Sequence, residues 1–347
     1  MDGGGGPRSR EITEPVDLCL PSGQLNPAAV GWTRTPLHRA NLLPGNARGR
    51  AATWSRTKKW EYVGIITDRH VVTVTASSLN YAGIHRVWVL DRTTGEEIDT
   101  SLTVPFAKDT HLPAVFGAGA VRVAGPRLAI AVDPAPTTNS PDALRVRAQT
   151  PRVRLDVTVA PPLGSELLGV VVPWSERQFQ YAVKSVGVPA SGTLTVDGAE
   201  HPVEGWASLD HGRGRWPYAI TWNWGAGSGT VDGVVTGLQL GGKWTEGTGT
   251  SDNGLFLDGR LHRIDEDLAW TYDALDASAA PWRVSGERVE VELRPFHERT
   301  EATNLGVVSM RVTQAFGHWT GWVDDDHGER RRVDGLVGWA QQAVNRW

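Results

Sequence analysis

The segment from Leu209 to Trp224, LDHGRGRWPYAITWNW, combines ionisable and aromatic side chains over a short stretch of sequence. Asp210 and His211 stand near its start and Arg213 follows. Aromatic residues then recur at even-numbered positions: Trp216, Tyr218, Trp222 and Trp224. In an extended chain, residues two apart point to the same side, so these four side chains would share one face of a strand. That face is either part of a hydrophobic core or the wall of a ligand pocket.

The chemistry of these side chains favours the pocket. Tryptophan and tyrosine carry polar atoms that need hydrogen-bond partners when buried, so leucine or phenylalanine would fill a dry core at lower cost. Asp210 supplies an acidic group beside the aromatic face. We therefore expect Asp210 to be catalytic and the four aromatic residues, with Arg213 and His211, to contact a ligand. Adjacent strand residues face opposite ways, so Asp210 and His211 are not expected to form a direct dyad.

The charge state of Asp210 is open at this stage, because two environments predict opposite outcomes. Tryptophan side chains facing the carboxyl group would desolvate it, raise its pKa and let it donate a proton near neutral pH. An arginine pointing at it would keep it ionised as a charged anchor. Glu246 and Asp252 are the candidates for a second carboxylate, and Asn253 and Tyr81 are further candidates for ligand contact.

The amino-acid composition argues against several classes of binding partner. The net charge is −4 over 347 residues and no basic stripe is present, which argues against a nucleic-acid partner. No stretch approaches the ~20 apolar residues of a transmembrane helix, and the N-terminus lacks the apolar run of a signal peptide, so we expect a soluble, cytoplasmic protein. Cys19 is the single cysteine, which excludes an intramolecular disulfide. The histidines lack the spacing of a zinc motif, so we expect no metal and no cofactor. The expected partner is a small molecule, either apolar or a carbohydrate.

The elements that must position these residues are mostly strands. Residues 152–159, RVRLDVTV, alternate apolar and polar side chains, and residues 289–294, VEVELR, repeat the pattern. Asp197-Gly198 and Asp258-Gly259 separate strand-like runs and are typical of tight hairpin turns. A 3.6-residue period at the end of the chain predicts an amphipathic helix with Asp334 as its N-cap. The apolar positions of this helix are Leu336, Trp339, Ala340, Ala343, Val344 and Trp347.

The amino-acid composition also changes along the chain. Residues 1–10 are glycine-rich and predict a disordered tail, and residues 11–58 contain prolines spaced too closely for regular elements. Eleven of the sixteen tryptophans lie from Trp206 onward, which separates a Trp-rich half from the rest. We therefore predict an N-terminal β domain at residues 59–190 and a Trp-rich C-terminal β domain at residues 191–347 that ends in the helix.

Several phrases together resemble the family of domains of unknown function numbered 2804: ITEPVDLCLPSGQLNPAAVGW, LNYAGIHRVWVLDRTTGE, LDHGRGRWPYAITWNWG and GLVGWAQQAVNRW. That family is grouped with lipocalin-like β-barrel proteins and has no established activity. The resemblance implies an all-β fold of two lipocalin-like antiparallel barrel or sandwich domains, here with the C-terminal helix. GWASLDHGRG, residues 205–214, is also distantly similar to a phrase of two-domain lipocalin-like proteins that include carotenoid 1,2-hydratases. That match carries over Asp210 and His211 only.

Three functions stay open. The first is acid-catalysed hydration or isomerisation of an apolar, isoprenoid-like ligand, in which a protonated Asp210 donates to a double bond. Tryptophan faces would stabilise the resulting cation by ~0.5–2 kcal/mol per contact. The second is a carbohydrate-active protein, in which Asp210 works with Glu246 or Asp252, because a glycosidase normally needs two carboxylates. The third is a non-catalytic small-molecule binder, in which Asp210 is a charged structural group.

Overall fold

Most of the chain is β-strand in the computed structural model, which describes residues 9–42 and 53–347 except 305 and 307. The expected disordered tail at residues 1–10 lies outside these residues apart from its last two. The N-terminal arm contains a short 3-10 helix, η1 (Pro27–Ala29), and a parallel pair of strands, β1 (Val16–Asp17) and β3 (His38–Arg39). No helix among the described residues is long and apolar enough to cross a membrane. The predicted all-β class is confirmed.

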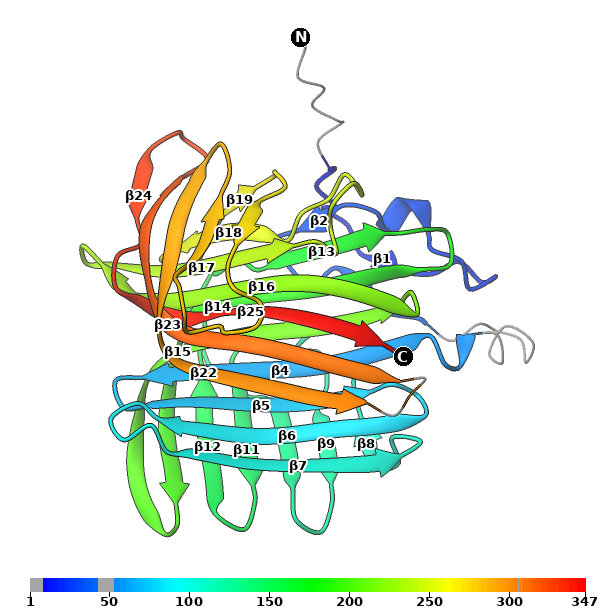
Figure 1. Cartoon of the computed structure of the whole chain (residues 1–347). Coiled ribbons are helices and arrows are strands. Elements are labelled where there is room, and N and C mark those ends of the chain that lie inside the picture. Colours follow the sequence, from blue (N-terminus) through cyan, green and yellow to red (C-terminus); the bar gives the residue numbers. More distant parts are fainter. Residues whose placement is uncertain (1–8, 43–52, 305, 307) are drawn as a thin grey trace.

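The first sheet contains thirteen strands of the described chain, in the order β7-β6-β5-β4-β15-β14-β12-β11-β10-β9-β8, with β13 beside β14 and β2 beside β13. The sheet curls, so that β4–β7 pack against β9–β12 across a shared apolar core (Figure 1). Its strands are β2 (Trp32–Thr33), β4 (Thr57–Thr67), β5 (His70–Ser78), β6 (Ala82–Asp91), β7 (Glu97–Pro105), β8 (Thr110–His111), β9 (Val121–Ala124), β10 (Ala129–Pro134), β11 (Leu144–Gln149), β12 (Val153–Val159), β13 (Leu168–Pro173), β14 (Phe179–Val196) and β15 (Ala199–Arg215).

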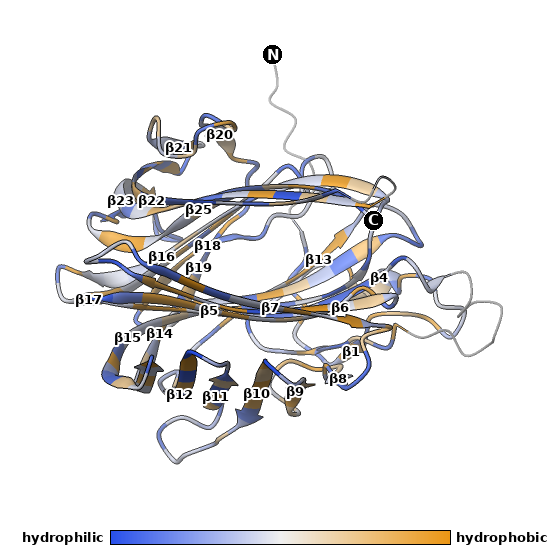
Figure 2. Ribbon diagram, turned by 60° about the horizontal axis from the view of Figure 1, so that its bottom comes forward, coloured by the Kyte–Doolittle hydropathy of each residue, from blue (hydrophilic) through white to orange (hydrophobic). Residues whose placement is uncertain are grey.

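The second sheet contains ten strands of the same described residues, in the order β19-β18-β17-β16-β25-β23-β22-β21-β20, with β24 beside β23. Figure 2 shows the two sheets stacked one above the other, with apolar stretches along many of the strands. The strands of the second sheet are β16 (Ala219–Val231), β17 (Val234–Gly242), β18 (Asn253–Leu257), β19 (Arg260–Ile264), β20 (Ala269–Thr271), β21 (Trp282–Ser285), β22 (Val289–Asn304), β23 (Ser309–Asp324), β24 (Arg330–Arg332) and β25 (Leu336–Arg346).

Local sequence patterns predict several of these elements correctly. In β12 the apolar positions are buried and every intervening residue is more exposed. Both Asp-Gly pairs form tight turns: φ is 48° and 85° at Asp197 and Gly198, and 46° and 79° at Asp258 and Gly259. Positive φ at both central residues is the conformation of a type I′ turn, whose twist matches that of the strands it joins.

The predicted C-terminal helix is wrong, because residues 336–346 form strand β25. β25 lies in the interior of the second sheet, where it pairs with β16 on one side and β23 on the other. A strand that is covered on both faces buries consecutive residues and loses the period of two that would identify it. Asp334 caps no helix; its carboxylate accepts a hydrogen bond from the Gly321 backbone N–H at 2.9 Å.

The chain passes from the first sheet to the second between Arg215 and Ala219. The boundary predicted at residues 190/191 falls inside β14, and the β14–β15 hairpin keeps both of its strands in the first sheet. The division into folding units at residues 59–190 and 191–347, after an arm at 11–58, stays a prediction.

The two sheets meet across an apolar interface, whose buried residues include Ile66, Val186, Trp224, Phe316 and Trp339. The backbones of the two sheets approach closely at a bulge of β14, where Gly187 has a φ of 77°. A Cβ atom at this position would lie 3.1 Å from the Cα of Gly237 on β17. Only glycine accommodates both the positive φ and this close approach.

Candidate functional site

A cleft of about 580 Å³ opens between the two sheets. Ile66 of β4 and Trp206 of β15 line it from the first sheet, and Ser228 of β16 and Val337 of β25 line it from the second. The charged residues of its lining are Asp68, Arg92 and Glu204. The volume is within the usual range for a small-molecule site, ~300–1,000 Å³.

The strands that line the cleft continue into the middle of the interface between the two sheets. Residues two apart share a face, so each strand carries an inward row of side chains. Each row runs four residues along its strand, from the cleft wall to the middle of the interface, which is a distance of about 13 Å. The rows are Trp206, Ser208 and Asp210 on β15; Ile66, Gly64 and Tyr62 on β4; Ser228, Ala226 and Trp224 on β16; and Val337, Trp339 and Gln341 on β25.

Asp210 lies at the inner end of its row and forms a buried ion pair. Its Oδ2 atom lies 2.9 Å from Nζ of Lys184 and accepts a hydrogen bond from Nε1 of Trp60 at 3.0 Å. Lys184 stands opposite Asp210 on β14, and the two residues are 5% and 6% exposed. The second oxygen, Oδ1, is buried without a hydrogen-bond partner. The positively charged neighbour of Asp210 is therefore Lys184, whereas the sequence suggested an arginine.

Asp252, just before β18, is a second buried carboxyl group at the same interface. Burial raises its pKa to about 6; the charge of Lys184 opposes this effect and that of Asp210 adds to it. Its Oδ2 accepts a weak hydrogen bond, 3.4 Å long, from Nε2 of Gln239, whose Oε1 accepts one from Nε1 of Trp224 at 2.9 Å. Its Oδ1 is also buried without a partner. The interface thus holds two acidic groups in different electrostatic settings.

Three aromatic side chains enclose these groups on the side toward the cleft. The ring centroids of Tyr62 and Trp224 are 5.1 Å apart, as are those of Trp224 and Trp339. Nζ of Lys184 lies 4.3 Å from the ring centroid of Trp224. Further polar atoms along the inward rows are buried without partners: Tyr62 Oη, Ser208 Oγ, Ser228 Oγ and Trp339 Nε1. Buried polar groups are almost always hydrogen-bonded, so these unpartnered atoms mark the middle of the interface as a candidate site.

Trp216 and Trp222 belong to a separate aromatic cluster. The ring of Trp216 is 3% exposed and its centroid lies 5.1–6.2 Å from those of five other tryptophans: Trp60, Trp174, Trp222, Trp244 and Trp347. Trp60 joins this cluster to Asp210 through the hydrogen bond from its indole N–H. Of the predicted aromatic wall, Trp224 therefore lies at the carboxyl groups, and Trp216 and Trp222 lie behind Trp60.

His211 and Arg213 point to the other face of the first sheet, as the alternation of a strand requires. Nδ1 of His211 and Nη2 of Arg213 each lie 2.6 Å from Oε1 of Glu61 on β4. Arg213 also donates to the backbone oxygens of Trp60 and Pro113. Burial alone would raise the pKa of Glu61, but His211 and Arg213 outweigh it and lower that pKa. This group links β4, β15 and the loop before β9, on the side away from the cleft.

The other four candidates lie away from Asp210 or have structural partners. Tyr218 is 43% exposed. Tyr81 lies in the turn before β6, beside Nζ of Lys58. Asn253 accepts from the Gly241 backbone N–H at 2.6 Å and donates to the backbone oxygen of Glu266 at 2.9 Å. Glu246 is exposed in the loop after β17 and accepts from the backbone N–H of Lys243.

Sequence reasoning missed Lys184, Trp60 and Tyr62, three residues that contact Asp210 or lie next to it. One signal for Lys184 was present, because it is the single charge in the apolar stretch FQYAVKSVGV, which predicts a buried partner for it. Trp60 and Tyr62 carry no such signal. Only the pairing of β4 with β15 places them near Asp210.

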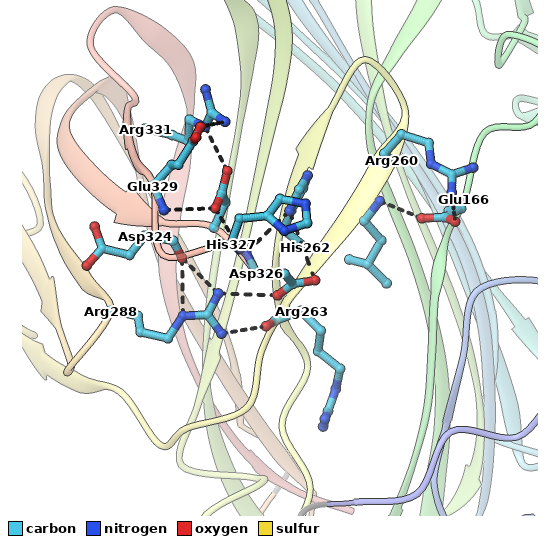
Figure 3. A network of polar contacts seen from close by, with 12 residues as sticks. Glu166, Arg260, His262, Arg263, Arg288, Asp324, Asp326, His327, Glu329 and Arg331 are labelled. Carbon is cyan, nitrogen blue, oxygen red and sulfur yellow. Dashed lines mark hydrogen bonds and ion pairs between the residues drawn. The ribbon is translucent and has the colours of Figure 1, made fainter.

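The acidic hairpin between β23 and β24 is held by ion pairs (Figure 3). Arg288 donates to the backbone oxygen of Asp324 and to Asp326, and Arg331 pairs with Asp325. His262 of β19 lies 4.0 Å from Asp326. Among the residues that the structure describes, no group of three or more histidine, cysteine or acidic side chains is arranged to hold a metal ion. The hairpin is thus a charged structural contact between strands.

Comparison with known proteins places the chain in a family. An AttH-type protein from Nitrosomonas europaea has a similar fold, with 15% sequence identity, a TM-score of 0.51, and coverage of 83% of this chain and 92% of that one. CghA matches with 14% identity, a TM-score of 0.49, and coverage of 84% and 88%. Kievitone hydratase from Nectria haematococca matches with 11% identity, a TM-score of 0.49, and coverage of 85% and 90%. At this level of identity the first likeness establishes the fold alone, and the other two carry no functional argument. No curated protein matches the sequence. The model of the domain of unknown function DUF2804 matches residues 9–347, nearly the whole sequence, and the chain therefore belongs to the DUF2804 family.

Proposed function

We propose that the chain binds a small, largely apolar molecule between its two sheets and catalyses proton transfer to it, as in the hydration or isomerisation of a double bond. One observation carries the proposal. Two buried carboxyl groups lie at the interface between the sheets, Asp210 on β15, which lines the 580 Å³ cleft, and Asp252 just before β18, and each has one oxygen without a hydrogen-bond partner.

The different surroundings of the two carboxyl groups support different roles. A pKa of about 6 keeps part of the Asp252 population protonated near neutral pH, so we assign it the role of acid. Oδ2 of Asp210 pairs with the Lys184 amine and accepts a hydrogen bond from the Trp60 indole N–H, whereas its Oδ1 has no partner, so we assign Asp210 the role of base. This reverses the expectation from sequence, in which Asp210 donates the proton.

In a hydration, Asp252 gives its proton to one carbon of the double bond and leaves a cation on the other carbon. Water adds to that cation, and Oδ1 of Asp210 takes the proton that the added water releases. Exchange with solvent then returns both carboxyl groups to their starting states. A positioned acid or base contributes ~10²–10⁴ in rate. The rings of Tyr62 and Trp224, which pack against each other beside Lys184, are the aromatic faces that we assign to stabilising the cation.

The test is a binding titration followed by a turnover assay. Quenching of tryptophan fluorescence would be followed as purified protein is titrated with a series of acyclic isoprenoids and, separately, with oligosaccharides. Isoprenoids that bind would then be incubated with the protein, and the products analysed by mass spectrometry for the gain of one water or for an isomer. Asp252→Asn and Asp210→Asn are the test variants, and Glu246→Gln, an exposed carboxylate, is the matched control.

The proposal predicts saturable isoprenoid binding in all four proteins, with turnover lost by at least 100-fold in the two aspartate variants alone. Full turnover by Asp252→Asn would refute the assignment of the acid. Binding without turnover in the wild type would leave a non-catalytic binder as the function. Saturation by sugars alone would favour the carbohydrate-active alternative, with Asp210 and Asp252 as its carboxylate pair.

A further inference from the structure

We infer that Lys58 is a reactive amine that forms an imine with small aromatic aldehydes, at a second site remote from the cleft. Lys58 is the second residue of β4, and Ile66, which lines the cleft, lies eight residues further along the same strand. Eight strand residues span about 26 Å. The site shares no residue with the Asp210–Asp252 pair and does not depend on the proposed function.

The surroundings of the Lys58 amine are aromatic. Nζ lies 4.6 Å from the ring centroid of Tyr81 and 5.0 Å from that of Trp347, and the residue is 1% exposed. Its hydrogen bond goes to the backbone oxygen of Ser55 at 3.1 Å. Among the described residues Lys58 forms no ion pair, whereas the buried Lys184 has Asp210 as its partner. A buried ammonium without a carboxylate partner loses hydration and gains little in return.

These surroundings favour the neutral, nucleophilic form of the amine. Burial, with a smaller contribution from the charge of Arg56, lowers the pKa of Lys58 to about 7. About half of the Lys58 population is therefore neutral at pH 7. A lysine with the ordinary pKa of 10.5 has only about one neutral amine in three thousand at that pH.

The side chains that face the Lys58 amine include two from outside the strands, Tyr81 in the turn before β6 and Trp347 just after β25. Trp54 is 48% exposed and its ring centroid lies 6.4 Å from that of Tyr81, which in turn faces the amine. Residues in such positions open at lower free energy than strands paired on both sides. The flat rings of Tyr81 and Trp347 would also stack on the ring of an aromatic aldehyde. The same side chains therefore open a path to the Lys58 amine and bind the aldehyde.

The reaction is a condensation that needs no further partner. The neutral amine attacks the carbonyl carbon, the nitrogen loses its two protons, and the carbonyl oxygen leaves as water to give the C=N bond. Sodium cyanoborohydride, added as the probe reductant, delivers hydride to this carbon and converts the imine into a stable secondary amine.

The test compares all five lysines of the native, full-length chain. The protein would be incubated with benzaldehyde and cyanoborohydride at pH 7, and the rate of modification at each lysine measured by peptide mass spectrometry. We expect Lys58 to react at least tenfold faster than the exposed Lys108. Lys58→Arg keeps a cation between the rings but forms no imine, so this variant should lose the fast adduct while keeping the wild-type circular dichroism spectrum.

Two further measurements separate the aromatic site from other causes. Trp54→Ala should speed the modification of Lys58, because it removes part of the cover. In denaturing urea the preference for Lys58 should disappear. Equal or slower reaction of Lys58 than of Lys108 in the native chain would overturn the inference. A preference that persists in urea would overturn it too, since the cause would then be the local sequence.

Discussion

Replacing Asp252 by asparagine should stabilise the protein at neutral and alkaline pH and have little effect in acid. The pKa of this carboxyl group rises from 3.8 to about 6 on folding, chiefly because it is buried. The difference, 6 minus 3.8, is about 2 pH units, which corresponds to about 3 kcal/mol. Asparagine has nearly the same shape and no charge, so the variant avoids this cost.

The direction of the pH dependence follows from proton binding. Between pH 3.8 and 6 the folded protein holds a proton on Asp252 that the unfolded chain has released. The contribution of this group to stability is therefore fully present below pH 3.8 and is lost as the pH rises through 6. The free energy of unfolding of Asp252→Asn minus that of the wild type should grow by about 3 kcal/mol between pH 3 and pH 8.

The assay is urea denaturation followed by tryptophan fluorescence at a series of pH values, with both proteins measured in the same buffers. Glu246→Gln is the control, because this exposed carboxylate should change stability by less than about 0.5 kcal/mol at any pH. A difference between Asp252→Asn and wild type that does not vary with pH would refute the reasoning, as would one that shrinks as the pH rises.

Three further predictions concern a buried ion pair, a buried tryptophan and a buried histidine. Lys184→Met should destabilise the fold by about 3–5 kcal/mol, because it leaves the buried Asp210 carboxylate unpaired, and adding Asp210→Asn should recover most of that loss in urea denaturation; no recovery would contradict the ion pair. Trp216→Ala should cost about 3–5 kcal/mol, since it empties the centre of a buried cluster, and a cost below 1 kcal/mol would show that the cluster contributes little. Burial lowers the pKa of His38, so its neutral form stabilises the fold, and that stability should fall as the pH drops below 6.5, where the unfolded chain takes up the proton. His38→Gln should therefore flatten the decline in melting temperature between pH 7.5 and 5, whereas a variant with an unchanged decline would exclude His38 as its source.

Patterns confined to a few neighbouring residues predicted much of the fold. The alternation in β12 and the two Asp-Gly turns depend on contacts within a hairpin, so the sequence contains their whole cause. The sequence also identified Asp210 and Asp252 as a possible pair of carboxyl groups, because acidic residues near tryptophans are visible without a structure. It could not place the Lys184 amine 2.9 Å from Asp210, since that contact depends on the pairing of β14 with β15.

The sequence by itself determined that the chain is built of β-strands, and it pointed to the acidic and aromatic segment at residues 209–224 as part of a candidate site. Which residues meet there was decided by the tertiary structure. Trp60 reaches Asp210 across 150 residues of sequence, because β4 and β15 pair in one particular register, and no local pattern encodes that register. Strand β25 shows the same limit: its residues 338–341 are all buried, so this stretch has no alternation to mark its period, and only the packed sheets distinguish it from a helix.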